Sequence, residues 1–145
     1  METYTDKCDI FYIDDDPDDL YLFTSIAEEL GEQIKVFTEA DILVHALETA
    51  PSHPSIVLVD LNMPIKNGLE IMKEVRAYPR LRNLPFIIYS TANDSGSIMR
   101  ARALGATMYI IKPASVNKIK DLIKFMLTFD WSTHEVSYDN FLVSL

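Results

Sequence analysis

The sequence predicts an α/β domain with a parallel sheet covered by helices on both faces. Five short apolar runs alternate with five segments in which apolar residues recur at helical spacing. The runs are apolar at nearly every position, which is typical of parallel strands buried on both faces. Right-handed crossovers then leave few topologies. The length of 145 residues is one domain's worth, so we expect no second folded output domain.

The first two β–α units have clear boundaries. The apolar run 10–13 leads into a helix in which Pro17 suits the first position and Asp16 the N-cap. Gly31 reads as the end of this helix. The run 34–37 is a short second strand. The helical stripe that follows it consists of Ala40, Leu43, Val44 and Leu47.

Three further units continue the alternation. The remaining strands are the runs 56–59, 86–89 and 108–111. The helical stripes after them are Leu69, Met72 and Val75, then Ile98, Ala101 and Leu104, then Val116, Ile119, Ile123 and Met126. We therefore predict that residues 1–130 form the folded domain.

The C-terminal tail 131–145 falls outside this alternation. Its apolar residues are Trp131, Val136, Tyr138, Phe141, Leu142, Val143 and Leu145. That content is too apolar for a disordered polar tail. We expect the tail to pack on its own domain; packing on a neighbouring molecule, including exchange across a homodimer, is the alternative.

Composition excludes several classes of protein. A formal net charge of −9 argues against nucleic-acid binding, which depends on clustered Lys and Arg. No apolar run approaches the roughly 20 residues that span a bilayer, and the acidic, polar N-terminus is no secretory signal. The single cysteine, Cys8, fits a reducing compartment. We expect a cytoplasmic domain without nucleic-acid or membrane partners.

Polar side chains collect at the carboxyl ends of the predicted strands, where open α/β sheets bind ligands. They are Asp14, Asp15, Asp16, Asp60, Ser90, Thr91 and Lys112. Converging carboxylates repel one another, and a hard cation relieves the repulsion. We predict Mg²⁺ bound directly by Asp15 and Asp60, with Asp14 acting through a bound water and the Asn62 backbone carbonyl completing the set. The alternative is that the acidic trio only caps the first helix.

The same residues supply the parts for forming an aspartyl-phosphate. A carboxylate can attack phosphorus when a cation, a second positive group and a hydroxyl donor stabilise the phosphoryl oxygens. Asp60 is the predicted nucleophile. Lys112 supplies the positive group and Ser90 the hydroxyl.

Five motifs follow one another in the sequence: Ile13-Asp14-Asp15-Asp16-Pro17, Val59-Asp60-Leu61-Asn62-Met63-Pro64 with Gly68, Ser90-Thr91-Ala92, Leu104-Gly105-Ala106 and Tyr109-Ile110-Ile111-Lys112-Pro113. In these motifs, over about residues 8 to 129, the chain resembles the receiver domain of two-component response regulators. The family differs from this chain in usually having Thr at position 90 and a large aromatic residue at position 114, where the chain has Ala114.

The resemblance implies a flavodoxin-like fold, a three-layer sandwich around a five-stranded sheet in the order 2-1-3-4-5. It implies that Asp60 accepts a phosphoryl group from a sensor histidine kinase or a histidine phosphotransfer protein. Asp14 and Asp15 are then assigned to the metal, and Lys112 to the phosphoryl oxygens. The strand-end pair Ser90-Thr91 and the aromatic Tyr109 form the switch. The Lys112–Pro113 peptide bond is expected to be cis.

We therefore predict a stand-alone signalling switch that acts by contact with a downstream protein. It is not an enzyme beyond catalysing its own phosphorylation and dephosphorylation. Two alternatives are a phosphorylation-independent adaptor and a Mg²⁺-dependent phosphohydrolase with an aspartyl nucleophile. Such hydrolases commonly carry a second Asp two residues after the nucleophile, and here that position is Asn62.

Overall fold

All five predicted strands form and lie in one parallel sheet in the computed structural model of the protein, which describes residues 8–49, 54–132 and 136–143. These strands are β1 (Asp9–Ile13), β2 (Lys35–Phe37), β3 (Ser55–Val59), β4 (Phe86–Ser90) and β5 (Met108–Ile111). They run in the order β2-β1-β3-β4-β5, so the flavodoxin-like prediction is confirmed. A further strand, β6 (Leu142–Val143), extends the sheet beyond β5.

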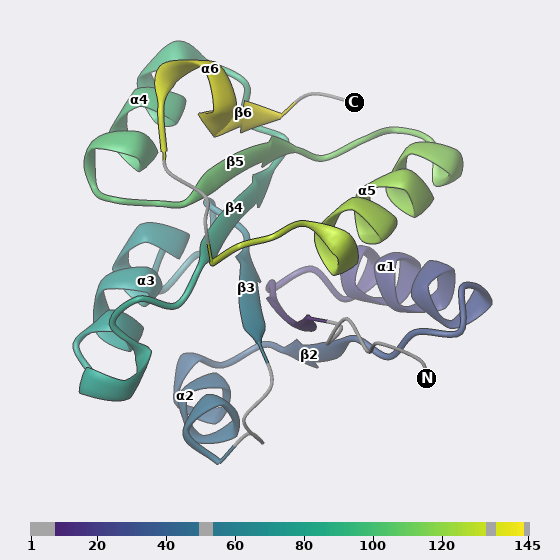
Figure 1. The fold of residues 1–145 in the computed structure, drawn as a ribbon, viewed down its shortest axis with the longest axis horizontal. Coiled ribbons are helices and arrows are strands. Elements are labelled where there is room, and N and C mark those ends of the chain that lie inside the picture. The colour runs from purple at the N-terminus through teal and green to yellow at the C-terminus, as the bar shows by residue number, and fades with distance from the viewer. Residues whose placement is uncertain (1–7, 50–53, 133–135, 144–145) are drawn as a thin grey trace, which may run out of the picture.

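The helices cover both faces of the sheet (Figure 1). On one face lie α1 (Pro17–Glu29) and α5 (Val116–Thr128). On the other lie α2 (Ala40–Glu48), α3 (Gly68–Arg76) and α4 (Ser95–Ala103), with the short 3₁₀ helix η1 (Pro79–Leu81) after α3. The N-cap prediction for α1 is confirmed, because the Asp16 side chain accepts a hydrogen bond of 2.9 Å from the Asp18 N–H. None of the helices in the described ranges is long and apolar enough to cross a membrane.

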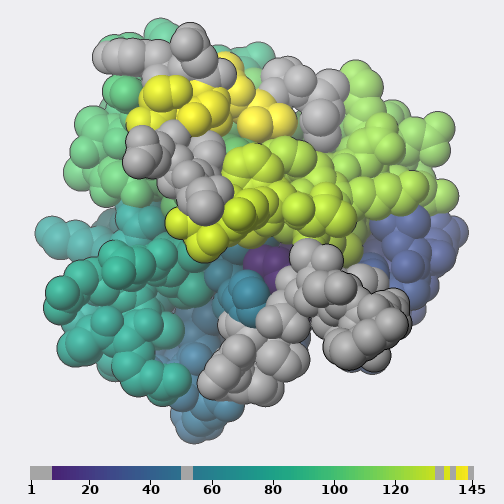
Figure 2. Space-filling view, in the orientation of Figure 1, coloured from purple at the N-terminus to yellow at the C-terminus, as the bar shows by residue number. Residues whose placement is uncertain are grey.

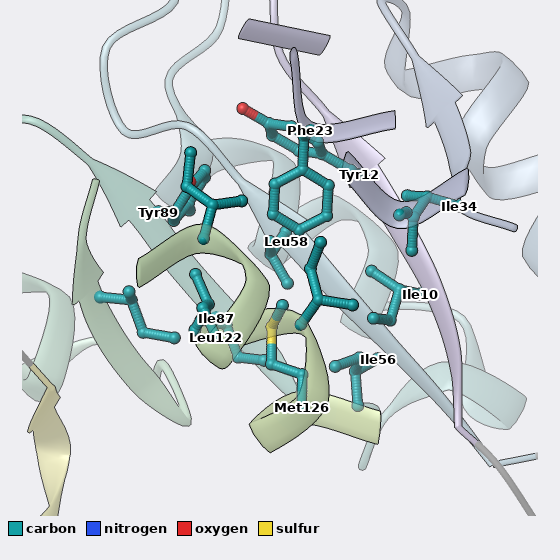
Figure 3. Close-up of a cluster of buried hydrophobic side chains, with 14 of the residues drawn as sticks. Ile10, Tyr12, Phe23, Ile34, Ile56, Leu58, Ile87, Tyr89, Leu122 and Met126 are labelled. Atoms are coloured by element: carbon teal, nitrogen blue, oxygen red, sulfur yellow. The ribbon is translucent and has the colours of Figure 1, made fainter. Parts of the chain in front are cut away.

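The core has two halves because successive strand residues point to opposite faces of the sheet. Ile10 and Tyr12 of β1 pack toward α1 and α5, whereas Phe11 and Ile13 pack toward α2 and α3. In the first half, Tyr12, Phe23 and Tyr89 gather at one end of the cluster, with Met126 and Ile56 at the other (Figure 3). Tyr12 makes edge-to-face contacts with Phe23 and Tyr89, at ring-centroid distances of 5.0 and 5.6 Å. These aromatic rings pack directly below the carboxyl end of the sheet.

The C-terminal residues 136–143 lie at the outer edge of β5, on the side of α4 (Figures 1 and 2). They form α6 (Tyr138–Phe141) and β6, in which Leu142 pairs with Tyr109 and Val143 with Ile110. Phe141 is 2% exposed, and its ring centroid lies 6.4 Å from that of Tyr109. The segment therefore adds both a strand and a core side chain to the fold.

The Lys112–Pro113 peptide bond is trans, since the described residues contain no cis peptide bond. The expected cis bond is therefore wrong. Trans is the intrinsically favoured isomer of an X–Pro bond, by about 0.5–1 kcal/mol. Beyond this bond the chain enters α5, whose N-cap Ser115 accepts a hydrogen bond from the Lys118 N–H at 3.2 Å.

Candidate functional site

Three carboxylates meet at the carboxyl edge of the sheet. Asp14 and Asp15 follow β1, and Asp60 follows the adjacent strand β3. One carboxylate oxygen from each lies within 4.8 Å of those of the other two. Asp14 is fully buried and Asp60 is 9% exposed, whereas Asp15 is open to solvent. The cluster can thus take a hard cation that keeps part of its water shell.

The Asp14 carboxylate is held by three donors. Its Oδ2 accepts hydrogen bonds from the Tyr12 hydroxyl at 2.7 Å and the Lys112 Nζ at 2.9 Å, and its Oδ1 accepts one from the Asp16 N–H at 3.1 Å. Burial raises the pKa of Asp14, but these hydrogen bonds outweigh it, so the net pKa lies below the ordinary value. Asp14 therefore stays ionised, as a metal-binding carboxylate requires.

Asp60 has the opposite electrostatic balance. Burial raises its pKa to about 6, and the negative charge of Asp14 adds to that rise. Lys112 and a hydrogen bond from the Asn62 backbone act against it. The ionised Asp60 is thus stabilised less than its neighbour, which makes this carboxylate the one that gains most from an added positive charge.

Lys112 follows β5 and projects its ammonium into the carboxylate cluster. Its Nζ lies 2.7 Å from Asp19 Oδ2, 2.9 Å from Asp14 Oδ2 and 3.7 Å from Asp60 Oδ2. Burial lowers the pKa of Lys112, but the hydrogen bonds to Asp19 and Asp14 outweigh it and raise the pKa above its usual value. The ammonium is 5.6 Å from the centroid of the Tyr89 ring.

Sequence reasoning missed Asp19. The available clue was its position on α1, one helical turn before the buried Phe23, which places Asp19 on the helix side that faces the sheet. The run of acidic residues at the end of the first strand is the stronger signal in the sequence, so Asp19 was not included among the site residues. Its contact with Lys112 shows that a fourth carboxylate belongs to the site.

The predicted switch residues lie at the ends of β4 and β5. Ser90 is buried, and its Oγ accepts a hydrogen bond of 3.2 Å from the Ala92 N–H, whereas Thr91 is exposed. Tyr109 is fully buried, and its hydroxyl donates to the Ala92 carbonyl at 2.7 Å. One loop residue, Ala92, thus connects the two predicted switch side chains.

The loop after Asp60 folds back tightly on it. Gly68 donates its N–H to the Leu61 carbonyl at 3.1 Å, and a Cβ at this glycine would lie 2.5 Å from the backbone oxygen of Asp60. Asn62 lies between them with an exposed side chain, and its carbonyl as a metal ligand stays a prediction. The close approach at Gly68 fixes the backbone that presents Asp60.

Comparisons with known proteins agree with this arrangement. The sequence model of the response regulator receiver domain matches residues 10–124. Chemotaxis protein CheY1 of Helicobacter pylori strain J99 is 32% identical over 91 residues, which cover 61% of this chain and 73% of that protein.

Solved structures show the same fold. A response regulator receiver domain from Rhodospirillum rubrum has a TM-score of 0.71 and 29% identity, and the match covers 83% of this chain and 94% of that one. The phosphorylated cyanobacterial phytochrome response regulator RcpA has a TM-score of 0.66 and 26% identity, with 90% and 96% covered. The family match runs from β1 to β5 and includes the carboxylate cluster and Lys112, so this chain belongs to the response regulator receiver domains.

Proposed function

We propose that this receiver domain is a phosphorylation-activated signalling switch whose phosphoacceptor is Asp60. The observation that carries the proposal is the approach of three carboxylates within 4.8 Å, with the Lys112 ammonium 3.7 Å from Asp60 Oδ2. Receiver domains of the CheY type are signalling proteins rather than classical enzymes. The phosphodonor is a phosphohistidine on a sensor kinase or on a phosphotransfer protein.

In the proposed transfer, an Asp60 carboxylate oxygen attacks phosphorus, the bond between phosphorus and the histidine nitrogen breaks, and the imidazole leaves. Asp14, Asp15 and Asp60 would hold Mg²⁺, which would supply positive charge to the phosphoryl oxygens. The Asp14 carboxylate, kept ionised by its hydrogen bonds, helps to hold the cation. Lys112 donates to a phosphoryl oxygen from the side of β5.

The signal then passes through the Ser90–Ala92–Tyr109 connection. Ser90 Oγ accepts from the Ala92 N–H, so its hydroxyl hydrogen can be donated to a phosphoryl oxygen. Drawing the Ser90 end of β4 toward Asp60 moves Ala92, whose carbonyl holds the Tyr109 hydroxyl. We propose that the resulting change near α4 and β5 is read by a downstream protein. The similar regulator RcpA has been solved in a phosphorylated form, which supports phosphorylation as the input to this switch.

Intact-mass measurement tests the phosphoacceptor. The protein is incubated with Mg²⁺ and acetyl phosphate, and we expect a hydroxylamine-labile gain of about 80 Da, as for an acyl phosphate. Asp60→Asn removes the attacking oxygen and abolishes the gain. The control Glu28→Gln, an exposed acidic position on α1, keeps it.

Other results would contradict the proposal. If the native protein gains no mass, a phosphorylation-independent adaptor becomes the better description. If it turns over many phosphate monoesters rapidly, it is a phosphohydrolase. The amide of Asn62, at the position where such hydrolases commonly have a carboxylate, argues against that second outcome.

A further inference from the structure

The ammonium of Lys112 is shared among carboxylates from three different elements. Asp14 lies after β1, Asp60 lies after β3, and Asp19 lies on the first turn of α1. The distances rank them: 2.7 Å to Asp19, 2.9 Å to Asp14 and 3.7 Å to Asp60. The closest partner of the proposed phosphoryl-binding lysine is therefore a side chain outside the metal cluster.

These contacts use only part of the hydrogen-bonding capacity of the Lys112 ammonium. An ammonium group has three N–H donors. Two of them are used at hydrogen-bond distance by Asp19 and Asp14. The separation of 3.7 Å from Asp60 Oδ2 is too long for a hydrogen bond, so the third donor makes no hydrogen bond to the residues that the structure describes, and Asp60 is its remaining ion-pair partner among them.

The two anchors also restrict the lysine side chain. A free lysine samples many rotamers, and fixing its side chain in one of them costs conformational entropy. Here the side chain is only 11% exposed, and its ammonium is held by Asp19 of α1 and by Asp14, which follows β1. Asp14 is itself fixed by the Tyr12 hydroxyl and the Asp16 N–H. The position of Nζ is thus set before any phosphoryl group arrives.

We propose that Asp19 is a positioning residue, which holds Lys112 so that its third N–H faces a phosphoryl oxygen on Asp60. The inference rests on the proposed function of Asp60. The phosphoryl group fills the space between Asp60 and the ammonium, and Lys112 donates to it without leaving Asp19 or Asp14. Asp19 contributes through Lys112 and does not touch the reacting atoms.

The test compares Asp19→Asn with the matched control Asp18→Asn. Both positions lie in the first turn of α1, so each variant removes one negative charge near the same helix N-terminus. The readout is the rate of phosphorylation by acetyl phosphate at saturating Mg²⁺, followed by intact mass. We expect Asp19→Asn to lower the maximal rate about fivefold while leaving half-saturation by the donor unchanged. Asp18→Asn keeps the native rate.

A second readout follows the lysine directly. A buried ammonium held by two carboxylates gives a resolved ¹⁵N–¹H signal for Lys112 in the unphosphorylated protein. We expect Asp18→Asn to retain this signal and Asp19→Asn to lose it through faster motion and proton exchange. This measurement needs no phosphodonor and no metal.

Each contrary outcome has a distinct meaning. An unchanged rate in Asp19→Asn would overturn the positioning role. A faster rate would overturn it too, because Asp19 would then be a competitor that draws Lys112 away from Asp60. If the native protein itself gains no phosphoryl group, the proposed function fails, and the positioning role fails with it.

Discussion

At the scale of single residues, two buried carboxylates of the site differ in pKa because different hydrogen-bond donors surround them. Asp14 receives hydrogen bonds from Tyr12, Asp16 and Lys112 and has a lowered pKa. Asp60 is also buried but lies 3.7 Å from the ammonium, and its pKa is raised to about 6. Asp14 thus stays ionised, whereas the negative charge of Asp60 is less well compensated by neighbouring donors and cations.

This imbalance predicts that Asp60→Asn stabilises the metal-free protein. Because the folded-state pKa of Asp60 is raised, its neutral form favours folding below the ordinary value of 3.8, and this stability is lost as pH rises to about 6. Asn cannot ionise, so Asp60→Asn avoids the loss of stability that ionisation of Asp60 causes. We expect the free energy of unfolding to rise by about 3 kcal/mol at pH 7 and hardly at all below pH 4.

Urea denaturation at several pH values without Mg²⁺ measures the effect. Glu28→Gln, at an exposed position, serves as the control and is expected to change little. Saturating Mg²⁺ should narrow or reverse the difference, since the cation stabilises the native carboxylate cluster. A destabilised Asp60→Asn at pH 7 without Mg²⁺ would contradict the electrostatic account.

At the scale of elements, the loop from Asp60 to α3 is shaped by one close approach. A Cβ at Gly68 would lie 2.5 Å from the Asp60 carbonyl oxygen and 3.1 Å from its carbonyl carbon. Both are backbone atoms of the residue proposed as phosphoacceptor, so they cannot rotate away. The glycine is needed for space, and it connects the start of α3 to the site.

We therefore expect Gly68→Ala to destabilise the protein by about 1–3 kcal/mol, the range for overpacking a tight site. It should also slow phosphorylation of Asp60, because the backbone that presents the carboxylate has to shift. Gly96→Ala is the matched control: its Cβ would meet only the Asp94 side chain at 3.5 Å, and alanine favours the helix. Thermal unfolding and the intact-mass assay measure both variants. Equal stability of the two would contradict the role of Gly68.

The five strands and the helices between them could be predicted because each has a periodic pattern of apolar residues in the sequence. Alternation of apolar runs and helical stripes located the five β–α units, and strand ends located Asp14, Asp15, Asp60 and Lys112. Helical spacing relative to Phe23 indicates that Asp19 faces the sheet, but its contact with Lys112 depends on how α1 lies against β5 in space, which no sequence pattern records. Likewise, β6 is two residues long, too short for a recognisable period.

At the scale of the whole molecule, the C-terminal segment extends the core past the five β–α units. Trp131 Nε1 donates to the Met126 carbonyl at 2.9 Å, and its ring packs on Phe129 at a centroid distance of 4.6 Å. Further on, Phe141 is buried beside Tyr109. The segment therefore contacts both α5 and the strand that carries a proposed switch residue.

Substitution of Phe141 tests whether this segment belongs to the folding unit. Phe141 is 2% exposed, whereas its neighbour Leu142 is 42% exposed. Comparing substitutions at the two positions therefore distinguishes the effect of removing a buried side chain from that of any change in this segment. We expect Phe141→Ala to lower the free energy of unfolding by about 3 kcal/mol, as for other buried aromatic side chains. Leu142→Ala should cost well under 1 kcal/mol, as for surface positions. Chemical denaturation measures both.

Truncation after Asp130 completes the test at the same scale. If the segment packs on its own domain, the truncated protein is less stable and its mass in solution corresponds to the same oligomeric state as the full chain. If the segment is exchanged between copies, truncation instead abolishes association and leaves the stability of each copy unchanged. Analytical ultracentrifugation and denaturation together distinguish the two. We expect the first result, since Leu142 and Val143 pair with β5 of the same chain and Phe141 fills a core position beside Tyr109.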